Sequence, residues 1–171
     1  MNSDQTDSKP TLTDPFKRKI EYLRLSVTDK CNMRCFYCMP KHFKDFEQPE
    51  DWLTFDEIER VVAVFGELGV HRVRLTGGEP LVRKKLPELS ARLSCLPGIN
   101  DLSLSTNATL LEQQAVALYE AGIRRINVSL DTLDEGRFSD ITGGGKLDSV
   151  LKGLQKAKEV GFKPIKINMV V

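Results

Sequence analysis

Three cysteines within eight residues are the part of this chain best suited to chemistry. Cys31, Cys35 and Cys38 follow a C-x3-C-x2-C pattern, and a compact loop can turn all three thiols toward one point. Thiolates are soft ligands that suit iron–sulfur clusters or zinc. An iron–sulfur cube normally takes four protein ligands, so three cysteines would leave one iron open. An open metal position is typical of catalytic rather than structural sites.

Other interpretations use the same residues. His42 would complete a closed Cys3His zinc site with the three cysteines, giving a zinc-binding or redox-sensing module without turnover. A disulfide framework would need an even number of cysteines in a secreted chain. Residue types alone favour the iron–sulfur cluster, and they leave zinc open.

Composition limits the remaining classes. The chain has 171 residues, enough for one domain with a sizeable core, and its formal net charge of +1 gives no indication of nucleic acid binding. No apolar run has transmembrane length, which argues against a membrane protein, and Asp4 and Asp7 interrupt any signal peptide. Clustered, reduced cysteines then predict a cytoplasmic protein. Cys95 stands apart and is predicted to be a buried helix residue.

The chain alternates strands and helices. Residues 1–19 are polar and aperiodic, which predicts a flexible N-terminal arm. Strands are expected over 23–27, 72–76, 101–105, 124–130 and 165–171. Helices are expected after two capping boxes, Thr54–Glu57 and Thr109–Glu112, and over the leucine-rich segments 86–96 and 147–161. Residues 131–145 are expected to form a loop with room for one helical turn. This order predicts βαβ units and a parallel sheet, with the cysteine loop leaving the C-terminal end of the first strand.

Each expected strand has one apolar and one polar face. Leu23, Leu25 and Val27, for example, alternate with Arg24 and Ser26. A closed barrel packed with side chains would be apolar inside, so a polar inner face favours a wide or partly open barrel around a hydrated hollow. A sheet with one face in solvent explains the same pattern.

The polar face is also cationic. Arg24, Arg74 and Lys166 come from three different strands, are expected to converge inside the hollow and lack a compensating glutamate. Arg72 either joins them there or lies nearer the rim of the barrel. Fixed cations in a concave site attract an anion, and the arginine fork fits phosphate best. The sequence therefore predicts a phosphate-bearing ligand.

The cysteine motif, with an aromatic pair before its last cysteine, resembles the signature of radical S-adenosylmethionine enzymes. The longer stretch LRLSVTDKCNMRCFYCMP resembles the GTP 3′,8-cyclase family of molybdenum cofactor biosynthesis more specifically. The resemblance implies an α/β fold, a partial (β/α)6 TIM-like barrel truncated after about the fifth strand. The implied barrel favours the hydrated hollow over a sheet with one face in solvent. The resemblance also implies a 4Fe–4S cluster whose open iron is chelated by S-adenosylmethionine, which favours the cluster over zinc.

The resemblance assigns roles to residues. Thr76-Gly-Gly-Glu-Pro80, by itself an ordinary strand-to-helix turn, matches the family's GGE motif that holds the methionine amino group. The implied cofactor-binding residues are Tyr37, Gly77, Gly78, Glu79 and Ser129. The implied GTP-binding residues are Arg24, Arg74, Ser105 and Lys166, with Ser105 standing where the family more often has threonine. No side chain is assigned a catalytic role, because the cofactor performs the difficult step.

The implied activity is that of a lyase. One electron from the reduced cluster cleaves S-adenosylmethionine, and the resulting 5′-deoxyadenosyl radical takes hydrogen from C3′ of GTP, whose carbon radical then attacks C8 of guanine. Implied partners are GTP and an electron donor such as a flavodoxin or ferredoxin, with a homodimer left open. Another radical enzyme with a different substrate is the alternative. The resemblance covers residues 20–171 as a core domain and about the first half of such enzymes, whose second cysteine-ligated cluster has no counterpart here.

Overall fold

The structure, a computed structural model, describes residues 11–39, 43–47 and 49–171. His42, the fourth ligand of the alternative zinc site, lies outside the described residues. The strands are β1 (Tyr22–Ser26), β2 (Arg72–Thr76), β3 (Asp101–Thr106), β4 (Arg125–Ser129) and β5 (Ile165–Asn168). The helices are η1 (Pro49–Asp51), α1 (Phe55–Glu67), η2 (Pro80–Val82), α2 (Leu86–Ser94), α3 (Leu111–Glu120), α4 (Glu135–Thr142) and α5 (Leu147–Val160).

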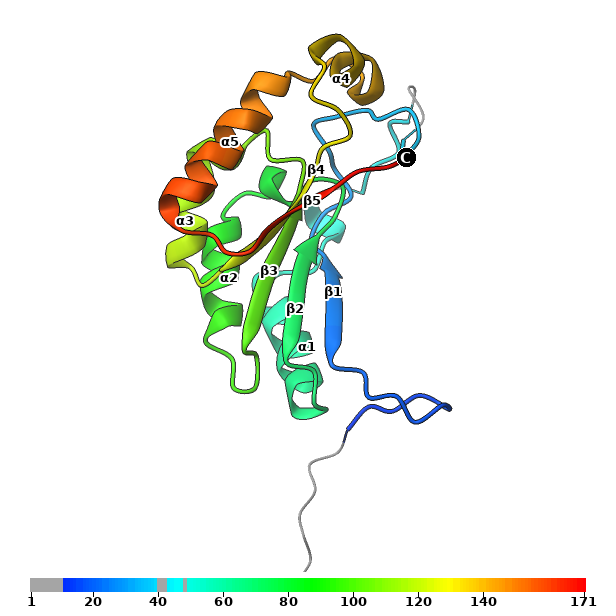
Figure 1. Cartoon of the computed structure of the whole chain (residues 1–171). Helices are drawn as coiled ribbons and strands as arrows, with labels where there is room; N and C mark the ends of the chain where they lie inside the picture. Colours follow the sequence, from blue (N-terminus) through cyan, green and yellow to red (C-terminus); the bar gives the residue numbers. More distant parts are fainter. Residues whose placement is uncertain (1–10, 40–42, 48) are drawn as a thin grey trace, which may run out of the picture.

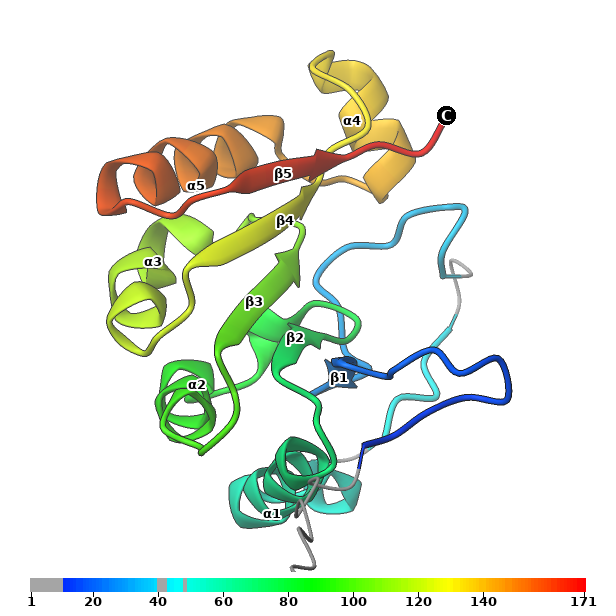
Figure 2. The same cartoon turned by 60° about the horizontal axis from the view of Figure 1, so that its bottom comes forward.

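The five strands form one parallel sheet in chain order, β1-β2-β3-β4-β5. Helices α1, α2, α3 and α5 cover one side of the curved sheet and leave the other side without a helical layer (Figure 2). This arrangement confirms the predicted α/β fold and is consistent with a partial barrel of five strands. The loop after β1 and helix α4 both lie at the end of the sheet toward which the strands point (Figure 1).

The core lies between the sheet and these helices. The outward-facing strand residues Val73, Leu75, Leu104, Ile126 and Val128 are completely buried against leucines and valines of the helices. Burial of such side chains contributes roughly 1.5–3 kcal/mol each. Hydrophobic packing on this face therefore fixes the polar face on the other side, because strand side chains alternate.

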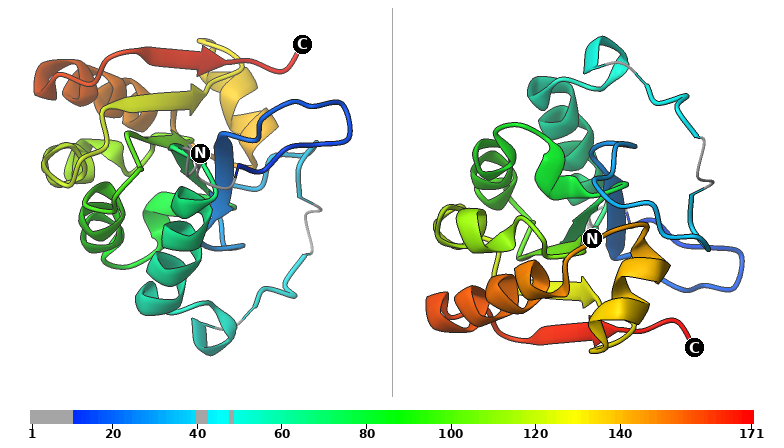
Figure 3. Two further views of the ribbon diagram at one scale, coloured as in Figure 1. Left: turned by 90° about the horizontal axis from the view of Figure 1, so that it is seen from below. Right: turned by 90° about the horizontal axis from the view of Figure 1, so that it is seen from above.

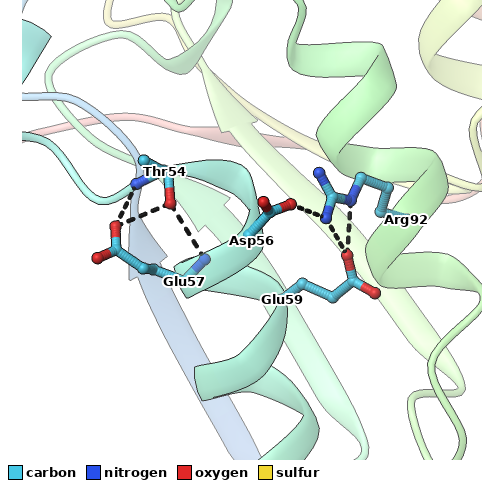
Figure 4. Close-up of polar contacts among 5 residues, drawn as sticks. All are labelled: Thr54, Asp56, Glu57, Glu59 and Arg92. Carbon is cyan, nitrogen blue, oxygen red and sulfur yellow. Dashed lines mark hydrogen bonds and ion pairs between the residues drawn. The ribbon is translucent and has the colours of Figure 1, made fainter.

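Helix α1 begins where the sequence predicts. The Thr54 hydroxyl accepts from the Glu57 N–H, and the Glu57 carboxylate accepts from the Thr54 N–H at 2.8 Å, which completes the capping box (Figure 4). Figure 4 also shows Arg92 of α2 reaching two acids of α1: it donates to Glu59 at 2.6 Å and pairs with Asp56. These partly exposed pairs contribute little on their own but tie the two helices together.

Two local predictions are wrong, and a third is only partly right. The second capping box does not form, since Leu110 is the N-cap of α3 and the Thr109 hydroxyl donates to Asn107 instead. Cys95 is exposed at the C-cap of α2, because it lies about 200° around the helix from buried Leu93. The helical turn allowed within the loop over 131–145 is the longer helix α4, two turns long, whose N-cap Asp134 accepts from the Arg137 N–H at 2.8 Å.

The described part of the predicted N-terminal arm carries local hydrogen bonds. Residues 11–20 form a hydrogen-bonded loop: Thr13 and Lys19 make an antiparallel bridge, and the Leu12 N–H donates to the Leu68 carbonyl at 3.0 Å. Asp14 organises the turn by accepting from the Arg18 side chain at 2.6 Å. None of the helices in the described part of the chain combines the length and apolar character needed to cross a bilayer.

Candidate functional site

The cysteine loop crosses the C-terminal ends of several strands. It leaves β1 and is attached in turn to the segments that follow β2, β3 and β4, which lie at the same edge of the sheet (Figure 3). In parallel α/β folds this edge is where ligands bind. The sequence predicts the loop's place in the fold; the structure adds the contacts that hold it.

The Gly-Gly-Glu turn after β2 holds the base of the loop. The Gly78 N–H donates to the Thr28 carbonyl and the Glu79 N–H to the Lys30 carbonyl, both at 2.8 Å. A Cβ added at Gly78 would lie 2.4 Å from the Asp29 carbonyl oxygen and 2.5 Å from that of Lys30. Glycine is therefore required at 78 by the protein's own backbone. The prediction that the two glycines let a ligand approach stays untested.

A ring of three side chains attaches the loop to β3. The Asn32 amide donates to the Thr109 hydroxyl at 2.8 Å, and that hydroxyl donates to the Asn107 side-chain oxygen at 2.7 Å. The Asn107 side-chain amide donates to the Asn32 side-chain oxygen at 2.9 Å, which closes the ring. Asn32 lies between the first two cysteines, so the ring fixes the loop close to two of its thiols.

Helix α4 holds the second half of the loop. The Arg34 N–H donates to the Thr142 carbonyl at 2.9 Å and the Phe36 N–H to the Ile141 carbonyl at 3.1 Å. Gly143 ends the helix in the left-handed region at φ 70°, and a Cβ there would lie 2.9 Å from the Arg34 carbonyl oxygen. The loop and α4 lie side by side at this end of the molecule (Figure 3, right).

Tyr37 provides the last attachment. Its hydroxyl donates to an Asp131 carboxylate oxygen at 2.6 Å, and the other oxygen of Asp131 accepts from the Val170 N–H at 2.9 Å. Burial, and then the hydrogen bond to Asp131, raise the pKa of Tyr37 above its ordinary value. Tyr37 is consequently a neutral donor at physiological pH, with about half of its surface exposed.

The three thiols differ in exposure. Cys31 and Cys35 are half-buried, and Cys38 is exposed. Burial raises the pKa of Cys31 and of Cys35, so both are protonated thiols at neutral pH without a metal, and a metal must displace their protons. Among the described residues no three cysteine, histidine, aspartate or glutamate side chains meet at one ion-sized point. A cluster does not require this, because each thiolate binds a different iron.

Glu79 lies deeper than the motif suggests. Its carboxylate is 1% exposed and accepts hydrogen bonds from the Thr106 hydroxyl at 2.7 Å and the Asn107 N–H at 2.6 Å. It also caps η2 by accepting from the Leu81 N–H at 3.1 Å. Burial raises its pKa, and the three hydrogen bonds partly offset this effect. In this conformation Glu79 joins the end of β2 to the end of β3.

The remaining predicted cofactor and substrate residues lie on the uncovered face of the sheet. Arg24 and Arg74 are direct neighbours in register, and the Arg74 side chain donates to the Ser103 hydroxyl at 3.3 Å. Lys166 lies on β5, the outermost strand on the side of the sheet opposite β1, and is in register with Asn127 of β4. Ser105 pairs with Asn127, and Ser129 is exposed at the end of β4. The two arginines are thus brought together, and Lys166 lies across the concavity from them.

Sequence reasoning missed several residues of this site. Asn32, Asn107 and Asp131 form the attachments described above, and Arg125 lies on the same face as Arg74, where it makes a two-pronged pair with Asp101. The alternation of β4 could have placed Arg125, since residues 125, 127 and 129 share a face. The polar ring carries no local pattern, because its members lie 75 and 77 residues apart.

Taken together, these features define an open parallel α/β barrel whose first loop carries three thiols at the C-terminal ends of the strands. The chain belongs to the Radical SAM superfamily, whose family model matches residues 25–171. It is 49% identical over 160 residues to the GTP 3′,8-cyclase of Pelotomaculum thermopropionicum, covering 94% of this chain and 49% of that protein. The chain therefore spans about half the length of the curated relatives it matches.

Solved structures share the fold. Methylornithine synthase PylB superposes with a TM-score of 0.70 at 18% identity, over 86% of this chain and 44% of that chain. Streptococcus suis SuiB, solved with S-adenosylmethionine bound, superposes with a TM-score of 0.66 at 25% identity, over 87% of this chain and 32% of that chain. Both likenesses agree with a partial barrel.

Proposed function

We propose that this chain is the radical-generating domain of a GTP 3′,8-cyclase. The observation that carries the proposal is the loop with Cys31, Cys35 and Cys38, which is attached to the segments after β2, β3 and β4. The loop lies beside the face of the sheet that the helices leave uncovered, and that face is cationic. The 49% identity to a GTP 3′,8-cyclase supports the specific activity. Family membership supports a 4Fe–4S cluster and S-adenosylmethionine as cofactors.

The residues present fit these cofactors. Cys31, Cys35 and Cys38 supply three soft thiolate ligands and leave one iron for S-adenosylmethionine. Once bound, cluster and nucleoside together supply one-electron chemistry that activates a C–H bond of the substrate. Tyr37 borders the site from the loop after β1 and Ser129 from the end of β4. Ser129 offers a hydroxyl group to a polar nucleoside, whereas the Tyr37 hydroxyl donates to Asp131 and could only accept. Gly77, Gly78 and Glu79 shape the edge between them.

The substrate part of the proposal concerns the cationic face. Arg24, Arg74 and Lys166 would hold the triphosphate of GTP, since no ion pair involves them in the described part of the chain. Ser105 would add a hydroxyl between them and the cofactor edge. The chain's task is then to orient the ribose toward the bound nucleoside and to exclude water from the reacting atoms.

The test is cleavage of S-adenosylmethionine. The anaerobically reconstituted chain should, with dithionite, convert it to methionine and 5′-deoxyadenosine, and GTP should change the rate more than ATP does. Cys35→Ala should abolish cleavage, whereas Cys95→Ala should not, since Cys95 is exposed on α2 far along the chain from the loop. Cleavage that responds equally to GTP, ATP and other small molecules would contradict the GTP assignment and favour a radical enzyme with another substrate.

A further inference from the structure

The Tyr22 hydroxyl is buried and has no hydrogen-bond partner. In the described part of the chain two other buried side-chain atoms share this condition, on Asp29 and Trp52, and both of those residues line a cavity of about 160 Å³ beside the base of the cysteine loop. Tyr22 differs because it lies on the uncovered face of β1, in line with Arg24 and Ser26. Its unpaired hydroxyl thus belongs to the cationic face.

Two guanidinium groups lie against the Tyr22 ring. Arg74 approaches the ring centroid to 5.3 Å and Arg72 to 5.9 Å, and Arg72 is the register partner of Tyr22. Neither arginine has an ion-pair partner among the described residues, and the nearby carboxylate of Asp101 is engaged by Arg125. The two guanidinium groups thus lie against one ring, and neither forms an ion pair within the described residues, although Asp101 is in register with Arg72 and Arg74 also donates to the Ser103 hydroxyl.

This combination favours an anionic oxygen group as the partner of the Tyr22 hydroxyl. Buried hydroxyls in folded proteins nearly always have a hydrogen-bond partner, which is a bound water or ion where the protein offers none. Guanidinium groups can only donate hydrogen bonds, so they cannot satisfy the phenol as a donor. A group that accepts from the hydroxyl and also from both arginines must carry several oxygens and negative charge. A phosphate meets each requirement.

We infer that Tyr22 is a substrate-binding residue whose hydroxyl donates to the terminal phosphate of the nucleotide, an inference that rests on the proposed function. Tyr22 begins β1 and the cysteine loop follows its end, so the two lie about 13 Å apart along the strand. The nucleotide would lie along β1 and β2, its phosphate end at Tyr22, Arg72 and Arg74 and its sugar toward the cofactor edge.

Tyr22→Phe tests this, because it removes only the hydroxyl. We expect affinity for GTP and for inorganic tripolyphosphate, measured by calorimetry, to fall about tenfold, as for a hydrogen bond to a charged group. The ligand-free variant should need more urea to unfold than the wild type, because a buried unpaired polar atom is gone. Tyr119→Phe on α3, on the helix-covered side of the sheet, is the matched control and should leave tripolyphosphate affinity unchanged.

The other outcomes are decisive as well. If Arg74→Ala weakens tripolyphosphate binding and Tyr22→Phe does not, the role of Tyr22 is overturned and the proposed function stands. If Tyr22→Phe unfolds at lower urea with unchanged affinity, the hydroxyl is held by a structural water, and the inference is again overturned. If neither variant changes the affinity of a wild type that binds GTP, both the inference and the phosphate-binding role of this face fail.

Discussion

The Tyr37 hydroxyl lies 2.6 Å from a carboxylate oxygen of Asp131, although 94 positions separate the two residues in the chain. The other Asp131 oxygen accepts from the backbone of Val170, just after β5. One carboxylate therefore joins the cysteine loop, the end of β4 and the exit of β5. The position of the third cysteine depends on this junction, since Cys38 follows Tyr37 directly.

Tyr37→Phe should loosen the loop without unfolding the domain. The lost hydrogen bond is half exposed, so we expect a loss of about 0.5–1 kcal/mol in the free energy of unfolding. Amide hydrogen exchange at residues 36–39 should become faster. Asp131→Ala should lower the free energy of unfolding further, because it also leaves the Val170 N–H without its acceptor. Unchanged exchange in both variants would show that the junction does not hold the loop.

Gly78→Ala should disrupt the base of the cysteine loop. The added methyl group would lie 2.4 and 2.5 Å from two backbone oxygens, which cannot move without displacing Asp29 and Lys30. We expect lower stability and a clear loss of bound iron after reconstitution. Gly136→Ala in α4 is the control: its methyl group would meet only Asp134 at 3.4 Å, and alanine favours helix. Equal iron content in the two variants would contradict this role of Gly78.

Glu79 should make stability depend on pH. Burial raises the pKa of its carboxyl above the usual value of 4.5, so the folded state holds this proton more tightly than the unfolded state. The stability due to this group is complete below pH 4.5 and is lost as the pH rises through the raised pKa. Urea midpoints measured from about pH 4.5 to 7 should therefore fall more steeply, or rise less, in the wild type than in Glu79→Gln. If the urea midpoints of the wild type and of Glu79→Gln change in parallel with pH, the raised pKa of Glu79 is contradicted.

Substitution on the cationic face should weaken nucleotide binding. Arg24→Ala, Arg74→Ala and Lys166→Ala each remove a cation without an ion-pair partner in the described part of the chain. We expect GTP affinity by calorimetry to drop roughly ten- to a hundredfold per site, with a smaller drop in high salt. Lys152→Ala, whose ammonium pairs with Asp148 on α5, should leave affinity unchanged. A drop of similar size in all four variants would indicate a non-specific charge effect.

Local sequence signals predicted the framework well. The alternation of polar and apolar residues over Arg72–Thr76 predicts β2 with its observed bounds, and the Thr54–Glu57 capping box predicts the start of α1. The same signal fails at Thr109, because Asn107 and Asn32 compete for its hydroxyl from positions that only the folded sheet brings near. A capping box is therefore informative only where no such competitor lies close in space.

The site was predicted by composition and resemblance more than by geometry. The cysteines and the cationic strands are visible as residue types, whereas the attachments of the loop are not, since Tyr37 to Asp131 and Asn32 to Asn107 are long-range pairs. The structure also gives Gly78 and Glu79 a local role, because both contact the chain itself. Resemblance assigns these residues to a ligand, and that role stays a prediction.

The most direct measurement combines iron content with electron paramagnetic resonance of the reduced, anaerobically reconstituted chain. We predict a brown protein with close to four irons per chain, whose resonance spectrum changes when S-adenosylmethionine binds the open iron. Ala at position 31, 35 or 38 should abolish the colour, and Cys95→Ala should keep it. Stoichiometric zinc without iron, or a four-iron spectrum that saturating S-adenosylmethionine leaves unchanged, would contradict a three-cysteine cluster with an open iron.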